Sequence, residues 1–170
     1  LKYSGHELDI TNLYLRDLYD SSILHDIGKV GIPDHILLKP GALTPEEFKL
    51  IMTHTTVGYQ SLREASRDLG ENSFLKMAME ITLYHHEQWN GEGYPHGLKG
   101  TEIPLSARIV TIADIYDALI SKRPYKDAYT HEQSVEIMKK ESYRFDPLLF
   151  QIFLDNEAEF NRIRIEFSNK

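Results

Sequence analysis

The chain has 170 residues, which is enough for one domain with its own hydrophobic core. Its 26 acidic and 19 basic residues leave a net charge of −7, which argues against a protein that covers the phosphates of a long nucleic acid. Charged residues interrupt every apolar run, so no membrane span is predicted in this segment. Cysteine is absent, which excludes disulfides and thiolate ligands, so any metal must be bound through nitrogen and oxygen.

Helical spacing dominates the N-terminal half of the chain. Apolar residues recur every three or four positions over residues 10–27, and Gly28 and Gly31 end this first predicted helix. A loop is predicted over residues 31–41. The run from Thr44 through Glu47 then combines an N-cap threonine, a proline at the first helical position and a capping-box glutamate, so a second helix begins there. Its predicted buried stripe is Phe48, Ile51, Met52, Thr55, Tyr59 and Leu62.

The C-terminal half is also predicted to be helical, apart from one long loop. A third helix covers residues 74–87, and residues 88–104 follow with four glycines and two prolines, which exclude a regular helix or strand. A fourth helix covers residues 106–121. Its predicted inward-facing residues are Ile109, Ile112, Ala113, Tyr116 and Ile120.

Two further helix starts complete the predicted fold. Thr130 with Gln133 caps a fifth helix, and Asp146 with Pro147 opens a sixth. The apolar face predicted for the sixth helix consists of Leu149, Phe153, Phe160 and Phe167. We therefore predict an all-α fold: one helical bundle of six or more helices over residues 1–170, in which residues 148–170 form the C-terminal helix. A small hairpin in the glycine-rich loop is the alternative for that loop.

Six side chains with metal-ligand chemistry stand on, or at the ends of, the first four predicted helices. They are His25, Asp26, His54, His85, His86 and Asp114. His85 continues the apolar stripe of its helix, where a histidine is more often a hydrogen-bonded core residue than a ligand. Asp114 lies in an apolar run, where an unpaired buried carboxylate costs several kcal/mol, so it requires a cation or a metal.

The spacing of these residues is compatible with two ions. Successive residues on a helix point about 100° apart, so His85 and His86 suit two ions better than one. The carboxylate of Asp26 has two oxygens and can bridge a metal pair. Imidazoles and carboxylates without thiolates favour Fe, Mn, Ni or Zn over Ca or Mg. Metal pairs about 3.5 to 4 Å apart commonly hydrolyse phosphoesters, but spacing alone leaves open whether the six side chains converge.

One lysine and one basic cluster offer anion sites in this acidic chain. Lys29 follows His25 by four residues and lies on the same face if the helix persists, so it is either a phosphate clamp or a solvated lysine at a helix end. Lys122, Arg123 and Lys126 follow the fourth helix and are either capping residues or a local anion site.

At these residues the sequence resembles the HD-GYP group of the HD superfamily of metal-dependent phosphohydrolases. The matching motifs run in order over most of the chain. They are residues 24–29 (Leu-His-Asp-Ile-Gly-Lys), 31–34, 39–44, His54-Thr55, His85-His86-Glu87, 89–91, Gly93-Tyr94-Pro95, 97–100, Ile103-Pro104, Ala113-Asp114, 121–126 and Phe145-Asp146-Pro147.

The resemblance implies two, or at most three, divalent ions, with iron or manganese first and nickel or zinc as alternatives. It implies hydrolysis of cyclic di-GMP to pGpG, GMP or both, through attack of a metal-activated hydroxide on phosphorus. The implied metal ligands are His25, Asp26, His54, His85, His86 and Asp114, with Asp26 as the bridging carboxylate. Lys29 matches the phosphate-contacting lysine, and Asp26 and Lys29 carry the catalytic roles. Lys29, Tyr94, Arg123 and Lys126 match substrate-contacting positions.

Further expectations follow from the resemblance. A sensor or receiver domain upstream, a GGDEF-domain or other signalling partner, a bacterial cytoplasmic location and a homodimer are expected. Only 24 residues precede His25, so a further ligand from an upstream helix has no counterpart here, and we expect a domain truncated at its N-terminal helix. The alternative function is a weak or inactive module that binds a cyclic dinucleotide or a partner protein.

Overall fold

The computed structural model describes residues 2–3, 6–7, 10–70, 72–121 and 128–168 and confirms the all-α fold class. The α-helices are α1 (Asn12–Ser22), α2 (Asp34–Leu37), α3 (Pro45–Met52), α4 (His54–Leu69), α5 (Ser73–Tyr84), α6 (Leu105–Ile120), α7 (His131–Lys140), α8 (Pro147–Asp155) and α9 (Glu157–Ser168). Three 3-10 helices join them: η1 (Ile27–Gly31), η2 (Gly100–Glu102) and η3 (Ser142–Arg144).

A short antiparallel pair of strands precedes the helices and was not predicted. β1 (Lys2–Tyr3) pairs with β2 (His6–Glu7), with Lys2 opposite Glu7. Strands of two residues are too short to show the alternation by which a strand is recognised in a sequence. The glycine-rich loop after α5 contains no strand in its described residues 88–104, so the hairpin alternative for that loop is wrong.

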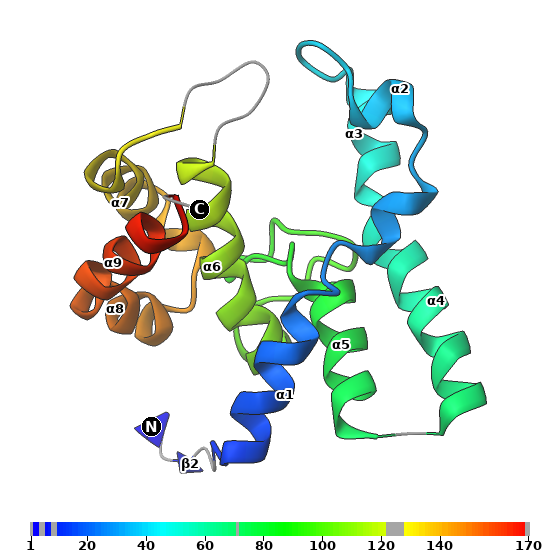
Figure 1. Cartoon of the computed structure of the whole chain (residues 1–170), viewed down its shortest axis with the longest axis horizontal. Helices are drawn as coiled ribbons and strands as arrows, with labels where there is room; N and C mark the ends of the chain where they lie inside the picture. The colour runs from blue at the N-terminus through cyan, green and yellow to red at the C-terminus, as the bar shows by residue number, and fades with distance from the viewer. Residues whose placement is uncertain (1, 4–5, 8–9, 71, 122–127, 169–170) are drawn as a thin grey trace.

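Helices α1, α5 and α6 form the centre of the molecule, with α4 packed on α5 and with α7, α8 and α9 grouped beside α6 (Figure 1). Two apolar clusters hold these layers together. Met77, Ile81 and Val110 join α5 to α6, with Tyr14 and Leu18 of α1 packed against them. The larger cluster joins α6 to α7 and α8 and contains Ile112, Tyr116, Val135, Met138, Phe145, Phe150 and Phe153.

The helix-capping predictions are confirmed, whereas several predicted faces are wrong. Thr44 and Thr130 both form the predicted capping boxes, and Asp146 accepts hydrogen bonds at the start of α8. The second and sixth predicted helices are each divided in two, at Thr53 and at Asn156. Residues beyond each break still reach the core, since Thr55 and Leu62 of α4 are buried and Phe160 of α9 packs against the larger cluster.

Three residues predicted to be buried are exposed. Phe48 lies on α3, which the break at Thr53 separates from α4, and it is 49% exposed. Phe167 near the end of α9 is 65% exposed. Ala113 is exposed because the two buried sides of α6 face α5 through Val110 and α7 and α8 through Ile112, which leaves Ala113 on the third side.

The first predicted helix ends five residues early, and this break positions the site. α1 ends at Ser22, and residues 23–26 form turns that lead into η1. The hydroxyl of Thr82 on α5 donates to the carbonyl oxygen of Leu24 at 3.0 Å, across 58 residues of sequence. A contact with a distant helix therefore stabilises the turn that carries His25 and Asp26.

η1 lies directly against α4 because two glycines face each other there. A Cβ on Gly28 would lie 1.9 Å from the carbonyl oxygen of His54 and 2.5 Å from the nitrogen of Gly58, so only glycine fits. This approach places the segment after Asp26 beside the first turn of α4, where His54 stands. Among the described helices none is long and apolar enough to cross a membrane.

Candidate metal centre and adjoining cleft

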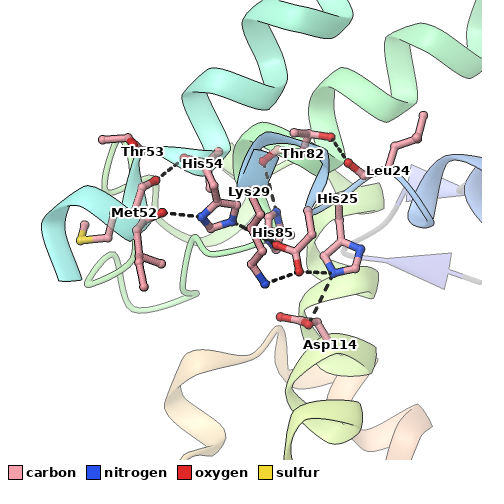
Figure 2. Close-up of polar contacts among 12 residues, drawn as sticks. Leu24, His25, Lys29, Met52, Thr53, His54, Thr82, His85 and Asp114 are labelled. Carbon is pink, nitrogen blue, oxygen red and sulfur yellow. Dashed lines mark hydrogen bonds and ion pairs between the residues drawn. The ribbon is translucent and has the colours of Figure 1, made fainter. Parts of the chain in front are cut away.

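Four parts of the chain bring the candidate ligands together. The turn after α1 supplies His25 and Asp26, the first residue of α4 is His54, the residues after α5 are His85 and His86, and the middle of α6 supplies Asp114. Figure 2 shows His25, Lys29, His54 and His85 pointing towards one another, with Asp114 approaching from α6. One ligand atom from each of Asp26, His54, His85 and His86 lies within 4.8 Å of the others.

Backbone carbonyls fix the tautomers of three histidines. The Nδ1 atoms of His25 and His54 lie 2.7 Å from the carbonyl oxygens of Ser22 and Ile51, and Nδ1 of His85 lies 3.0 Å from that of Ile81. A carbonyl oxygen only accepts, so each Nδ1 carries a proton and donates it. In the neutral rings, each Nε2 then presents a lone pair to the centre, which is the usual arrangement behind metal-binding histidines.

The lone pairs of this cluster face one another at short range. Nε2 of His54 lies 3.4 Å from Nε2 of His85 and 3.3 Å from Oδ1 of Asp26. That Oδ1 atom is buried and has no hydrogen-bond partner among the described residues. Three acceptor atoms with no proton between them repel one another, and a divalent cation removes this repulsion. The donor set therefore fits a metal ion.

The two oxygens of Asp26 face different neighbours. Oδ1 faces His54 and lies 3.8 Å from Nε2 of His85. Oδ2 accepts a hydrogen bond from Lys29 and lies 3.3 Å from Nε2 of His25, which is itself 3.6 Å from Oδ1 of Asp114. Each oxygen of Asp26 therefore faces a different set of candidate ligands.

Burial and pairing shift the pKa values of these groups. Burial lowers the pKa of His54, and it lowers the pKa of His85 to about 4 and that of His86 to about 3, so these rings stay neutral at pH 7. Burial also disfavours the charged form of His25, but hydrogen bonds with Asp114 and Asp26 outweigh it and raise its pKa to about 10.

The same hydrogen bonds act on the carboxylates. Burial raises the pKa of Asp26, but hydrogen bonds from His25 and Lys29 outweigh it and hold that pKa below its usual range. Burial also raises the pKa of Asp114, but the hydrogen bond from His25 outweighs it and lowers that pKa. When no ion is bound, a proton on His25 therefore compensates the two carboxylates.

His85 and His86 follow the end of α5 at Tyr84, whereas the sequence predicted a helix through Glu87. Both residues belong to the cluster, with ring centroids 4.0 Å apart. Tyr94 of the glycine-rich loop stacks on His86 at 4.7 Å, and its amide donates to the His86 carbonyl oxygen.

A cleft of about 800 Å³ opens beside the metal cluster, a size typical of small-molecule sites. α2 and α3 form one wall through Ile36, Leu37, Phe48 and Ile51, and α6 forms another through Thr111, Asp114, Ile115 and Ala118. Lys29, Lys39 and Arg144 bring positive charge to the lining. Lys39 pairs with Glu47 at 2.6 Å. Lys29 reaches the cleft from η1, not from a continued first helix.

Glu87 fixes the loop that covers one side of this cleft. Its side chain is buried, and its two carboxylate oxygens accept hydrogen bonds from the amides of His96 at 2.7 Å and Leu98 at 2.9 Å. Because those residues follow Tyr94, the Glu87 carboxylate holds the loop in the conformation that places Tyr94 on His86.

All six predicted ligands, together with Lys29 and Tyr94, lie at this cluster or line the cleft. The predicted substrate contacts Arg123 and Lys126 lie outside the described residues. Sequence reasoning missed Lys39, Glu87 and Arg144 as functional residues. Their only signal was their place within or beside the motifs: Lys39 before Pro40, Glu87 after the histidine pair and Arg144 before Phe145.

A family model described as HD domain matches residues 1–149, and the chain belongs to this family. Curated relatives support the same assignment. A protein of Vibrio cholerae named cyclic di-GMP phosphodiesterase is 49% identical over 161 residues, covering 94% of this chain and 33% of the relative. A Thermotoga maritima protein with the same name is 42% identical, covering 94% of this chain and 42% of the relative.

A third relative carries a different name. A Vibrio cholerae protein named 3′3′-cGAMP-specific phosphodiesterase 2 is 44% identical over 146 residues, covering 85% of this chain and 27% of the relative. The chain thus spans less than half the length of each of these relatives. Their names and the HD domain match confirm the resemblance to the HD-GYP group.

Proposed function

We propose that this chain is a metal-dependent phosphodiesterase that hydrolyses cyclic di-GMP. The observation that carries the proposal is the group of facing acceptor atoms on His54, His85 and Asp26 in the lining of a cleft of suitable size. The relatives named cyclic di-GMP phosphodiesterases support the choice of substrate. His25, Asp26, His54, His85, His86 and Asp114 hold two divalent ions, which we propose to be iron or manganese.

The chain's residues supply binding, orientation and charge. When bound, a pair of divalent ions lowers the pKa of water and polarises a phosphoryl oxygen. Asp26 would hold the ions together with the histidines, and the backbone carbonyls behind His25, His54 and His85 keep each Nε2 directed to the centre. Lys29, already beside Asp26, donates to a phosphoryl oxygen and stabilises the charge that develops on it.

The cleft positions the remainder of the substrate. Tyr94 of the glycine-rich loop stacks on His86 beside the cluster and contacts the dinucleotide, and Arg123 and Lys126 remain proposed contacts. Opening of the cyclic diester breaks one phosphorus–oxygen bond and yields pGpG, and a second hydrolysis yields GMP. An upstream regulatory domain, a GGDEF-domain partner, a homodimer and a bacterial cytoplasmic location likewise remain proposals for the protein that contains this chain.

Metal analysis combined with product chromatography tests this function. The chain is loaded with Fe(II) or Mn(II) under anaerobic conditions and incubated with cyclic di-GMP or with 3′,3′-cGAMP. We expect pGpG or GMP from cyclic di-GMP. Faster turnover of 3′,3′-cGAMP would correct the substrate, as the name of the third relative suggests. Binding of cyclic di-GMP by fully loaded protein without any product would instead support the non-catalytic signalling module.

A further inference from the structure

Arg144 lines the cleft but has no role in the metal cluster. It ends η3, and its carbonyl oxygen accepts a hydrogen bond from the amide of Trp89 at 2.9 Å, which joins it to the glycine-rich loop. One guanidinium nitrogen, Nη1, donates to Glu141 one turn earlier. Nε is buried and has no hydrogen-bond partner within the part of the chain that the structure describes. A guanidinium carries five N–H donors, so this group keeps a donor directed away from Glu141.

The cations of the cleft act at different places. Lys29 hydrogen-bonds to Asp26, so Lys29 lies beside the candidate metal ligands. Lys39 is held by Glu47 on the α3 wall. Arg144 and Tyr94 both line the cleft, and the carbonyl oxygen of Arg144 is hydrogen-bonded to Trp89 of the glycine-rich loop that carries Tyr94. Arg144 therefore lies on the side of the cleft that the glycine-rich loop covers.

A cyclic dinucleotide with a phosphate at the metal cluster has its bases away from the metals. Guanine presents two acceptors, N7 and O6, on one edge, whereas adenine presents an acceptor and an amino donor there. A guanidinium only donates, so it pairs with both guanine atoms and meets an unfavourable donor on adenine. The chemistry of Arg144 thus favours guanine over adenine at the Tyr94 side of the cleft.

We propose that Arg144 is a specificity-determining residue that reads the N7 and O6 edge of one guanine of the substrate. This inference rests on the proposed function and deepens it by assigning the base selectivity to a particular residue. Glutamine has one acceptor and one donor group and can pair with adenine in the corresponding way. Arg144→Gln therefore changes the preferred base, and Arg144→Lys keeps the charge but loses the two-pronged geometry.

The test compares three substrates in the metal-loaded chain. Cyclic di-GMP and cyclic di-AMP differ in the base, and bis(p-nitrophenyl) phosphate is a diester without a purine. For Arg144→Gln we expect kcat/KM for cyclic di-GMP to fall about 10- to 100-fold, the range for loss of one two-pronged base contact. The ratio of cyclic di-GMP to cyclic di-AMP binding should fall by a similar factor. Hydrolysis of bis(p-nitrophenyl) phosphate and metal content should stay unchanged.

Arg162→Gln is the matched control. Arg162 pairs with Glu159 three residues earlier on the exposed face of α9, as Arg144 pairs with Glu141, so its loss removes the same kind of ion pair away from the cleft. We expect no change in any readout. Unaltered base preference in Arg144→Gln would overturn the inference, and so would an equal loss with all three substrates, which indicates a structural role.

The binding measurement separates this inference from the proposed function. If the wild-type chain hydrolyses bis(p-nitrophenyl) phosphate but neither cyclic dinucleotide, the proposed function fails. Guanine-selective binding that Arg144→Gln abolishes would then still support the role of Arg144. Absence of guanine-selective binding in the wild-type chain would overturn that role.

Discussion

At the scale of single residues, Asp26 has the most demanding position. Its Oδ1 faces His54 and His85 without a hydrogen bond from a described residue, and its Oδ2 faces His25 and Lys29. A neutral amide in this place would direct N–H groups at a cation or at a lone pair. In the proposed site, binding of both ions therefore depends on the charge of this one carboxylate.

We predict that Asp26→Asn abolishes turnover of cyclic di-GMP and lowers the metal content of the purified chain. Product chromatography and elemental analysis measure the two effects. Asp20→Asn, which alters an exposed aspartate on α1, should leave both unchanged. Full activity of Asp26→Asn with normal metal loading would contradict the bridging role.

Tyr14 is a second residue whose surroundings give a measurable consequence. Its hydroxyl is buried and has no hydrogen-bond partner in the described part of the chain. Burial, with a contribution from the charge of Glu80, raises the pKa of Tyr14 to about 12. Between pH 10 and pH 12 the folded state keeps a proton that the unfolded state has lost, so stability falls as the pH rises through this window.

We predict that Tyr14→Phe removes the loss of stability that Tyr14 causes at alkaline pH. The free energy of unfolding of the variant minus that of the wild type should be about 1 kcal/mol larger at pH 11 than at pH 8. At pH 8 the substitution should be nearly neutral, because it deletes an unpaired polar group. Urea unfolding at the two pH values measures the change. If both proteins lose the same stability between pH 8 and pH 11, burial does not hinder the ionisation of Tyr14.

At the scale of the elements, the contact of η1 with α4 decides where two ligands stand. Gly28 follows Asp26 by two residues and lies against the backbone of His54 and Gly58. Both contacts are with backbone atoms, which cannot move aside as the end of a side chain can. The distance between the turn that carries Asp26 and the start of α4 is therefore set by the absence of a side chain.

We predict that Gly28→Ala destabilises the chain by about 2 to 4 kcal/mol and weakens metal binding, because η1 must move away from α4. Gly31→Ala is the control on the same element. Its Cβ would meet only the side chain of Val57, at 3.0 Å, and the effect should be below about 1 kcal/mol. Thermal unfolding with and without Mn(II) distinguishes the two variants, and equal effects would contradict this view of the contact.

At the scale of the whole molecule, the metal cluster joins parts that pack separately. The layer of α1, α4 and α5 supplies His25, Asp26, His54, His85 and His86. Asp114 comes from α6, whose other side packs on α7 and α8. A pair of ions bound as proposed would connect these layers through Asp114. Ions that bind only the folded chain also stabilise it by mass action.

We predict that removal of the ions lowers the thermal midpoint by about 5 to 10 °C relative to protein at 100 times the metal dissociation constant. Mn(II) added to chelator-treated protein should restore the midpoint, and Asp26→Asn should show no such shift. Calorimetry with matched metal analysis checks this. A midpoint that is independent of metal would show that the layers are held by their apolar clusters alone.

The sequence alone determined the features that depend on neighbouring residues. The capping boxes at Thr44 and Thr130 and the start of α8 at Asp146 act within three or four positions, so they could be predicted. The identities of the six candidate ligands and the irregular segment after α5 were also recognisable, because histidine and aspartate in apolar helices and clustered glycines are unusual locally.

Only the tertiary structure decided how these residues meet. The end of α1 at Ser22 depends on Thr82, 58 residues after Leu24, and the position of η1 depends on Gly58 in α4. The different surroundings of the two Asp26 oxygens likewise depend on segments far apart in the chain, and so does the place of Arg144 in the lining of the cleft. Helical periodicity reports which side of a helix is apolar, but the free energy of packing between layers fixes where each helix ends and which polar side chains face one another.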